Sequence, residues 1–205
     1  MRQTPITHLP PDYQADHIIH IMDDEILQAI GRYNLYLIPP FVIGGLLWHL
    51  LVRGLVSAPS PDLNLIHHLL LTLGAMVGTL IIHEGIHGLA MLWAGHKPRF
   101  GVFVKDQIPV AFYATTDDGL FRRTPFIIMA LAPLVLITLA GLGLMVVAPV
   151  NLHLYLGMAI TINGAGAAGD LYMSRIVWRY DEANTLIQDH SEGITIFTAS
   201  DSSAV

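Results

Sequence analysis

The stretch LIHHLLLTLGAMVGTLIIHEGIHGLAMLWA, residues 65–94, is apolar or small at almost every position, yet it carries His83, Glu84 and His87. About 20 apolar residues are enough for a helix to cross a bilayer. An ionisable side chain at membrane depth costs at least about 2.5–3.5 kcal/mol. The stretch therefore predicts a membrane-spanning helix, and its three ionisable residues predict a functional site on that helix.

The composition of the whole chain agrees with a membrane protein. Hydrophobic residues make up 53% of the sequence and charged residues 13%, whereas a soluble domain averages about 25% charged residues. The formal net charge of −6 provides no basic surface for a nucleic acid. Because the chain has no cysteine, disulfides, thiolate metal sites and cysteine nucleophiles are excluded.

Three further segments, residues 35–56, 125–148 and 152–170, are long and apolar enough to span a bilayer. Residues 13–33 place apolar side chains at roughly helical spacing with acidic ones opposite. This pattern indicates an amphipathic helix, either at the membrane surface or packed on the bundle's own soluble face. The predicted fold class is an all-α polytopic membrane protein with four transmembrane helices, an N-terminal amphipathic helix and a small cytoplasmic β-hairpin.

The hairpin prediction rests on two β-prone runs, residues 100–104 and 110–115, which give a hairpin at about 99–116. Residues 193–197 form another short strand-like run near the C-terminus. The sequence thus divides into an N-terminal segment (1–34), a membrane catalytic domain (35–180) and a C-terminal tail (181–205).

The distribution of positive charge predicts the orientation. Four spans place both termini and the hairpin on one side, which carries nine of the lysines and arginines, whereas the opposite side carries only Arg53. The positive-inside rule therefore predicts a multi-pass cell-membrane protein whose termini and hairpin are cytoplasmic. His87 then lies inside the membrane, near the cytoplasmic face.

The spacing of the three ionisable residues indicates metal chemistry. His83 and His87 are four residues apart, so on a helix they project from one face and can bind one zinc ion at about 2.0–2.1 Å each. Glu84 can reach a zinc-bound water and act as general base, as in the His-Glu-x-x-His arrangement of metalloproteases. The alternative is that the histidines and the glutamate only satisfy one another inside the bundle.

A catalytic zinc ion needs a third protein ligand as well as an open position for water. The candidates are Asp170, Glu182, His96 and His153. We expect His153 at the opposite membrane face and His96 in a turn beyond the helix. Asp170 is expected at the depth of His87, and the small residues 164–169 let membrane helices approach closely. Asp170 is therefore preferred, with a helix cap at the water interface as the alternative.

Asn163 lies two helical turns before Asp170, on the same face of the predicted helix. Its side-chain amide could hold the carbonyl of a scissile peptide bond. It could equally bond a neighbouring helix. Both interpretations stay open.

These features together resemble the site-2 protease class of intramembrane zinc metalloproteases, and more closely the bacterial membrane proteins described as zincin peptidases of unknown function. The resemblance covers about residues 65–197 and rests on HEGIHG at 83–88, APL at 132–134, Asn163 to Asp170, and LIQDHSEGI at 186–194. It implies one catalytic zinc ion held by His83, His87 and Asp170, with Glu84 as general base and Asn163 as a positioning residue.

The chain departs from the site-2 protease pattern in two ways. It has Gly169-Asp170-Leu171 where that class has Leu-Asp-Gly, and no proline lies between Asn163 and Asp170. Nothing in the sequence therefore predicts a break in the fourth helix.

The predicted function is intramembrane proteolysis, in which a peptide bond in or near a membrane-spanning segment of another protein is hydrolysed. One alternative is a membrane-embedded zincin that works at the cytoplasmic surface with Glu182 as third ligand. Another is a non-catalytic, metal-binding regulatory membrane protein. Two imidazoles and a carboxylate also suit other divalent ions. The hairpin either offers an edge to a substrate strand or packs as a surface loop.

Overall fold

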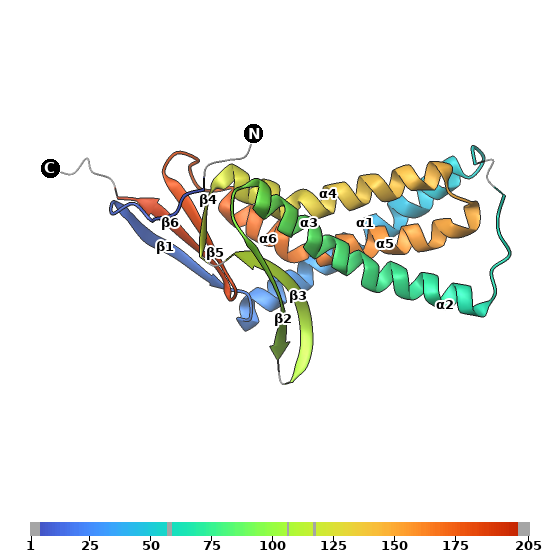
Figure 1. Cartoon of the computed structure of the whole chain (residues 1–205), viewed down its shortest axis with the longest axis horizontal. Coiled ribbons are helices and arrows are strands. Elements are labelled where there is room, and N and C mark those ends of the chain that lie inside the picture. The colour runs from blue at the N-terminus through green and yellow to red at the C-terminus, as the bar shows by residue number, and fades with distance from the viewer. Residues whose placement is uncertain (1–4, 57–58, 106, 117, 201–205) are drawn as a thin grey trace. The chain divides into compact units, whose positions relative to one another are not determined.

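The computed structural model describes residues 5–56, 59–105, 107–116 and 118–200. Its helices are α1 (Asp24–Val52), α2 (Leu65–Leu73), the π-helix η1 (Gly74–Gly78), α3 (Thr79–Trp93), α4 (Arg123–Val147), the 3-10 helix η2 (Val150–Leu152), α5 (His153–Gly166) and α6 (Ala168–Val177). Its strands are β1 (Tyr13–His20), β2 (Pro98–Lys105), β3 (Ile108–Thr116), β4 (Gly119–Arg122), β5 (Thr185–His190) and β6 (Gly193–Ala199) (Figure 1).

The chain forms two compact units. The first consists of Met1–Ile30, Glu84–Ala132 and Asp170–Val205, and the second of Gly31–His83 and Pro133–Gly169. Each boundary between them falls inside a helix, because α1, α3, α4 and α6 all contain residues of both units.

A four-stranded antiparallel sheet forms the first unit, with strand order β1-β6-β5-β4. One face of this sheet is apolar because alternate residues of the strands, among them Ile19, Ile187, Ile194 and Ile196, point the same way and are almost fully buried. They share one core with residues of α3, α4 and α6, including Met91, Phe126, Met129, Met173 and Val177. Burial of this face against helices holds the sheet in place.

The first strand overturns the prediction of an N-terminal amphipathic helix. Tyr13–His20 pairs with β6 at both of its ends, with one irregularity between Ala15 and His17. It buries Ile19, whereas Ile18 on the other face is exposed. The helix begins only at Asp24, where Asp24 and Glu25 in the first turn favour a helix start. It then runs unbroken to Val52, so residues 24–34 belong to the first long helix.

The second sheet is the predicted hairpin. Strands β2 and β3 pair antiparallel from Pro98↔Thr116 to Lys105↔Ile108, with one irregularity after Phe103. The hairpin passes α3 closely, since a Cβ at Gly88 would lie 2.6 Å from the ring of Phe100. Glycine at position 88 is therefore what allows β2 to lie against this helix (Figure 1).

Asp189 on β5 joins the hairpin to the larger sheet. Its carboxylate accepts hydrogen bonds from the Thr116 backbone N–H at 2.6 Å, the Thr115 hydroxyl at 2.9 Å and the Thr116 hydroxyl at 3.1 Å. Burial nevertheless dominates and raises the pKa of Asp189 to about 6.

This carboxyl makes stability depend on pH. Since the pKa of Asp189 is higher in the folded state than in the unfolded chain, its protonated form stabilises the fold below about pH 4, and that contribution falls as the pH rises through about 6. Asp189→Asn does not titrate but keeps an acceptor oxygen. We therefore expect the melting temperature of Asp189→Asn, measured relative to that of wild type, to increase as the pH is raised from 4 to 7. A difference in melting temperature that stays constant over this range would contradict the prediction.

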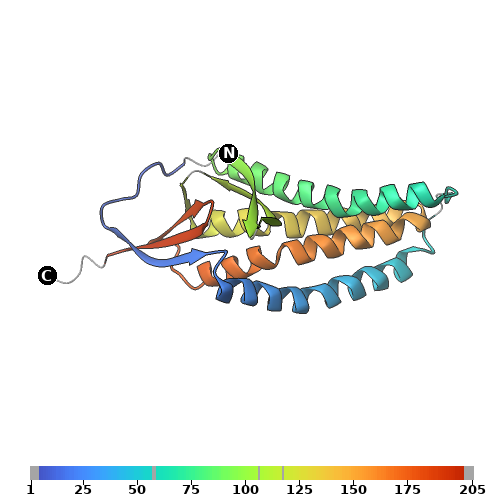
Figure 2. The ribbon, with the colours of Figure 1, turned by 90° about the horizontal axis from the view of Figure 1, so that it is seen from below.

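The second unit is a bundle of helices that lie side by side (Figure 2). Its small core joins Val52, Met145 and Ile160, with Phe41 and Trp48 of α1 packed against them. The Trp48 indole N–H donates to the Leu142 carbonyl at 2.9 Å. Many apolar side chains on the same helices face outward, including Leu46, Leu69, Leu73 and Leu139. Outward apolar side chains of this kind fit a lipid environment.

A π-helical turn interrupts one of these helices. Gly74–Gly78 forms η1 between α2 and α3, without breaking the helical path. A π-turn holds an additional residue and is frequent near functional sites. On α2, before this turn, the His68 imidazole hydrogen-bonds the hydroxyl of Tyr155 on α5.

The predicted all-α fold class with four transmembrane helices is wrong. The protein is mixed α/β with two antiparallel sheets, and strands hold 20% of its residues. Within the described residues, three helices are long and apolar enough to cross a membrane: Asp24–Val52, Leu65–Trp93 and Arg123–Val147.

The predicted fourth span is divided in two. Its α5 and α6 parts are separated at Ala167, whose ψ of 4° leaves the helical range. The sequence around the break is GAGAAG, and glycine disfavours a helix interior by about 1 kcal/mol relative to alanine. The break therefore arises without a proline.

Candidate metal centre

Helix α3 carries the first part of the candidate site. His83 and His87 lie one turn apart on this continuous helix, so their relative position is set by helix geometry. Both imidazoles are buried, and Glu84 between them is half-buried. The helix belongs to the apolar stretch Leu65–Trp93. The sequence therefore folds locally as the spacing predicts.

The side chain of Asp170 lies close to that of His87, within the first unit. It lies in the first turn of α6, and its Oδ2 is 3.5 Å from His87 Nε2. Two ligands bound at about 2.0–2.1 Å to one tetrahedral ion lie about 3.3 Å apart. The observed separation is therefore close to what a shared ion needs.

The other ring nitrogen of each histidine is engaged by an oxygen. His83 Nδ1 lies 3.0 Å from Asn163 Oδ1, within the second unit, and His87 Nδ1 lies 3.0 Å from the Met129 carbonyl oxygen, within the first. An amide oxygen and a carbonyl oxygen only accept, so each Nδ1 carries the hydrogen. In the neutral imidazole Nε2 is then the nitrogen with the lone pair, as in metal-binding histidines whose other nitrogen donates to an oxygen.

These residues fit a divalent metal ion. One ligand atom from each of His83, His87 and Asp170 lies within 4.8 Å of the others. Two imidazoles and one carboxylate are a donor set of catalytic zinc sites, which leave the fourth position to water or substrate. The group could therefore hold a metal ion.

Asn163 acts on His83 in this structure. It is almost fully buried, and its Nδ2 donates to the Leu134 carbonyl and the Thr138 hydroxyl, both at 3.2 Å. With both amide hydrogens engaged and its oxygen on His83, Asn163 has no donor left for a substrate carbonyl. The contacts support a role in orienting His83, rather than the oxyanion role considered from the sequence.

We expect Asn163→Ala to weaken zinc binding about 10–100-fold, as loss of a partner behind a metal-binding histidine does. Zinc affinity of the purified protein, measured by competition with a chelator, checks this. Asn163→Asp keeps an acceptor for His83 Nδ1–H and should retain tighter binding than Asn163→Ala. The matched control is Asn151→Ala, because the Asn151 side-chain Nδ2 donates to the loop carbonyl of Pro61 at 2.7 Å and not to a histidine. Zinc binding in Asn163→Ala as tight as in wild type would show that Asn163 does not orient His83 for the metal.

The three other candidate ligands are engaged elsewhere. Glu182 Oε2 accepts from the Thr124 N–H at 2.9 Å, the Thr124 hydroxyl at 2.6 Å and Arg123 Nε at 3.1 Å, so it caps the start of α4. His153 Nδ1 lies 3.0 Å from His49 Nδ1.

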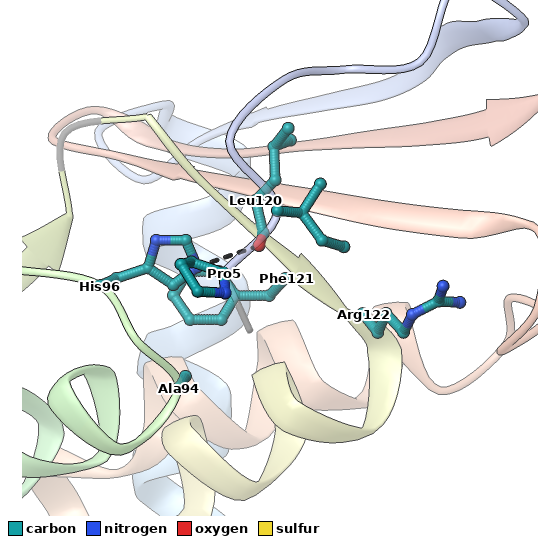
Figure 3. Close-up of a pocket in the computed structure, with 7 residues that line it drawn as sticks. Pro5, Ala94, His96, Leu120, Phe121 and Arg122 are labelled. Atoms are coloured by element: carbon teal, nitrogen blue, oxygen red, sulfur yellow. Dashed lines mark hydrogen bonds between the residues drawn. The ribbon is translucent and has the colours of Figure 1, made fainter. Parts of the chain in front are cut away.

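His96 lines a small cavity just beyond the C-terminal end of α3 (Figure 3). Its Nε2 lies 3.1 Å from the Leu120 carbonyl, and its ring packs on Phe121 with the centroids 4.4 Å apart. Burial lowers the pKa of His96. The residue therefore has a structural contact of its own and is not part of the metal group.

The comparison with protein families agrees with this geometry. Residues 76–184 match the family described as "Putative zincin peptidase", and this range is more than half of the chain. The chain belongs to this family. The matched range, residues 76–184, contains every residue of the candidate metal centre. It leaves out strands β1, β5 and β6. Neither a curated protein nor a solved structure matches the chain.

The sequence did not predict two contacts that hold residues of the candidate metal centre in place. The Met129 carbonyl that orients His87 is a backbone group, and any residue at that position would supply it. The Thr138 hydroxyl that helps to hold Asn163 lies on a helix whose sequence reads simply as apolar. Neither contact leaves a signal in the sequence.

Proposed function

We propose that this protein is an intramembrane zinc metallopeptidase of the site-2 protease kind, which hydrolyses a peptide bond in or near a membrane-spanning segment of another protein. The observation that carries the proposal is the grouping of His83 and His87 with Asp170 of α6. The two histidines and Glu84 lie on a helix within an apolar stretch of 29 residues. A catalytic group in such a stretch acts where membrane segments lie.

Each residue of the group has a distinct task. His83 and His87 would hold a zinc ion through Nε2, and Asp170 through a carboxylate oxygen. Zinc, when bound, would supply Lewis-acid activation of a water molecule and of the carbonyl of the scissile bond. Glu84 would be the group that accepts a proton from the attacking water and donates one to the leaving amine. Asn163 and the Met129 carbonyl keep the imidazoles oriented.

The hairpin fits a role in presenting the substrate. Phe100 of β2 lies over Gly88, the residue after His87, so β2 runs beside the His87 part of α3 within the first unit. A substrate segment must unwind before its peptide bonds become accessible, and an extended segment can add to the edge of a strand.

The alternative of a zincin that works at the cytoplasmic surface needs Glu182 as its third ligand. Glu182 instead caps the start of α4, which speaks against this alternative. Proteomic comparison of membranes from cells expressing wild type or Glu84→Gln tests the remaining proposal. We expect new peptide termini, in or within a few residues of apolar segments, only with wild type. Termini confined to water-soluble segments would favour surface proteolysis, and identical peptide patterns would favour a non-catalytic metal-binding protein.

A further inference from the structure

Two histidines share the side of the four-stranded sheet that lies opposite its helix-packed apolar face, at one end of the sheet. His20 on β1 and His190 on β5 are both register partners of Gly193 on the strand between them. Partners across antiparallel strands point to the same side. The two imidazoles therefore flank Gly193 on the face opposite the buried Ile19 and Ile194.

Gly193 leaves the space between these imidazoles free of a side chain. Its φ is +148°, and a Cβ at this position would lie 2.0 Å from the Ile19 carbonyl oxygen. Only glycine fits there. The ring centroids of His20 and His190 are 6.4 Å apart in an edge-to-face arrangement.

One carboxylate lies beside His20. Glu192 Oε2 lies 3.7 Å from His20 Nδ1, and the Glu192 backbone oxygen accepts from the Ile21 N–H, which fixes the turn beside β1. Asp118 and Glu192 both act electrostatically on His190. The side chains of His20 and Glu192 are 48% and 78% exposed, so they can rotate to close a coordination sphere.

His190 is oriented by a hydroxyl behind it. Its Nε2 lies 3.3 Å from Thr195 Oγ1, and Thr195 is buried in the sheet. When Nε2–H donates to this hydroxyl, Nδ1 presents a lone pair. Burial lowers the pKa of His190, which favours the neutral form that binds metals.

We propose that His20, His190 and Glu192 form a second binding site for a divalent transition-metal ion, separate from the group at His83. Two imidazoles and a carboxylate select zinc, copper or nickel over magnesium and calcium. The ligands come from the end of β1 and from the β5–β6 turn. A bound ion would therefore crosslink β1 to this turn. The site would make the stability of this sheet depend on metal supply.

Zinc titration of the full-length, detergent-purified protein, with any histidine tag removed, tests the proposal independently of proteolysis. The background is the His83→Ala/His87→Ala double variant, which lacks the group on α3. We expect it to bind one equivalent of zinc and to melt at a higher temperature with zinc, but not with magnesium.

Adding His190→Ala or His20→Ala should weaken this binding at least tenfold and remove the zinc-dependent rise in melting temperature. Glu192→Gln changes an exposed side chain and should weaken binding without loss of folding. The control is His17→Ala, an exposed histidine of the same strand. As a second measurement, the otherwise wild-type protein should bind two equivalents of zinc, and its His190→Ala variant one. Zinc binding that is absent in the background, or unchanged by all three substitutions, overturns the proposal.

Discussion

Purified Asp170→Ala protein is expected to contain almost no zinc in its α3 site, while wild type contains one ion there. Asp170 is the group's single carboxylate, 3.5 Å from His87, and its loss leaves two imidazoles. Substituting a residue behind a ligand already costs about 10–100-fold in affinity, so we expect loss of the ligand itself to exceed 100-fold. Metal analysis after dialysis measures this directly. It is done in the His190→Ala background, which removes the proposed second site at His20, His190 and Glu192.

The matched control is Asp62→Ala, which removes an exposed aspartate from the loop before α2. Asp170→Glu keeps a carboxylate and should retain part of the zinc. If Asp170→Ala holds zinc as tightly as wild type, Asp170 is not a ligand and the third position belongs to another group.

Glu84→Gln protein is expected to keep its zinc and lose its peptidase activity. Glu84 lies next to His83 but is not one of the three grouped ligands, so the amide should leave the metal in place. Glutamine cannot take a proton from water, and general base catalysis contributes about 10²–10⁴-fold. Parallel assays of zinc content and of cleavage in reconstituted vesicles measure both effects.

Zinc content and cleavage, measured in both variants and in wild type, separate four outcomes. Loss of zinc in Glu84→Gln would make Glu84 a ligand, and cleavage that survives in this variant would exclude it as general base. A metallopeptidase should lose both zinc and cleavage in Asp170→Ala. In Glu84→Gln it should lose cleavage but keep its zinc. Zinc without cleavage in wild type would support the metal-binding regulatory alternative.

The sequence was most informative where chemistry follows helical spacing. Residues four apart on a helix share a face, so the proximity of His83 and His87 could be predicted without any tertiary information. The grouping with Asp170 required an argument from membrane depth and from the small residues before it. The partners behind the histidines could not be predicted, because a backbone carbonyl at Met129 has no sequence signature.

The fold was less accessible because its strands depend on distant pairing. Tyr13–His20 has apolar residues that fit a helix as well as a strand, and its partner β6 lies more than 170 residues further along the chain. The hairpin was predictable because β2 and β3 are adjacent in sequence. The break at Ala167 was not predicted, because no proline marks it and glycines weaken a helix only by about 1 kcal/mol each.

The π-turn at Gly74–Gly78 has a consequence for how this helix tolerates changes in length. A π-turn winds more widely than an α-turn and takes up one additional residue over about the same rotation, so η1 keeps the side-chain directions of α2 aligned with the start of α3. Removing one residue, such as Val77, should convert η1 to α-helix and leave His68 beside Tyr155. Homologous chains that are one residue shorter here can therefore keep a histidine–tyrosine pair at these positions.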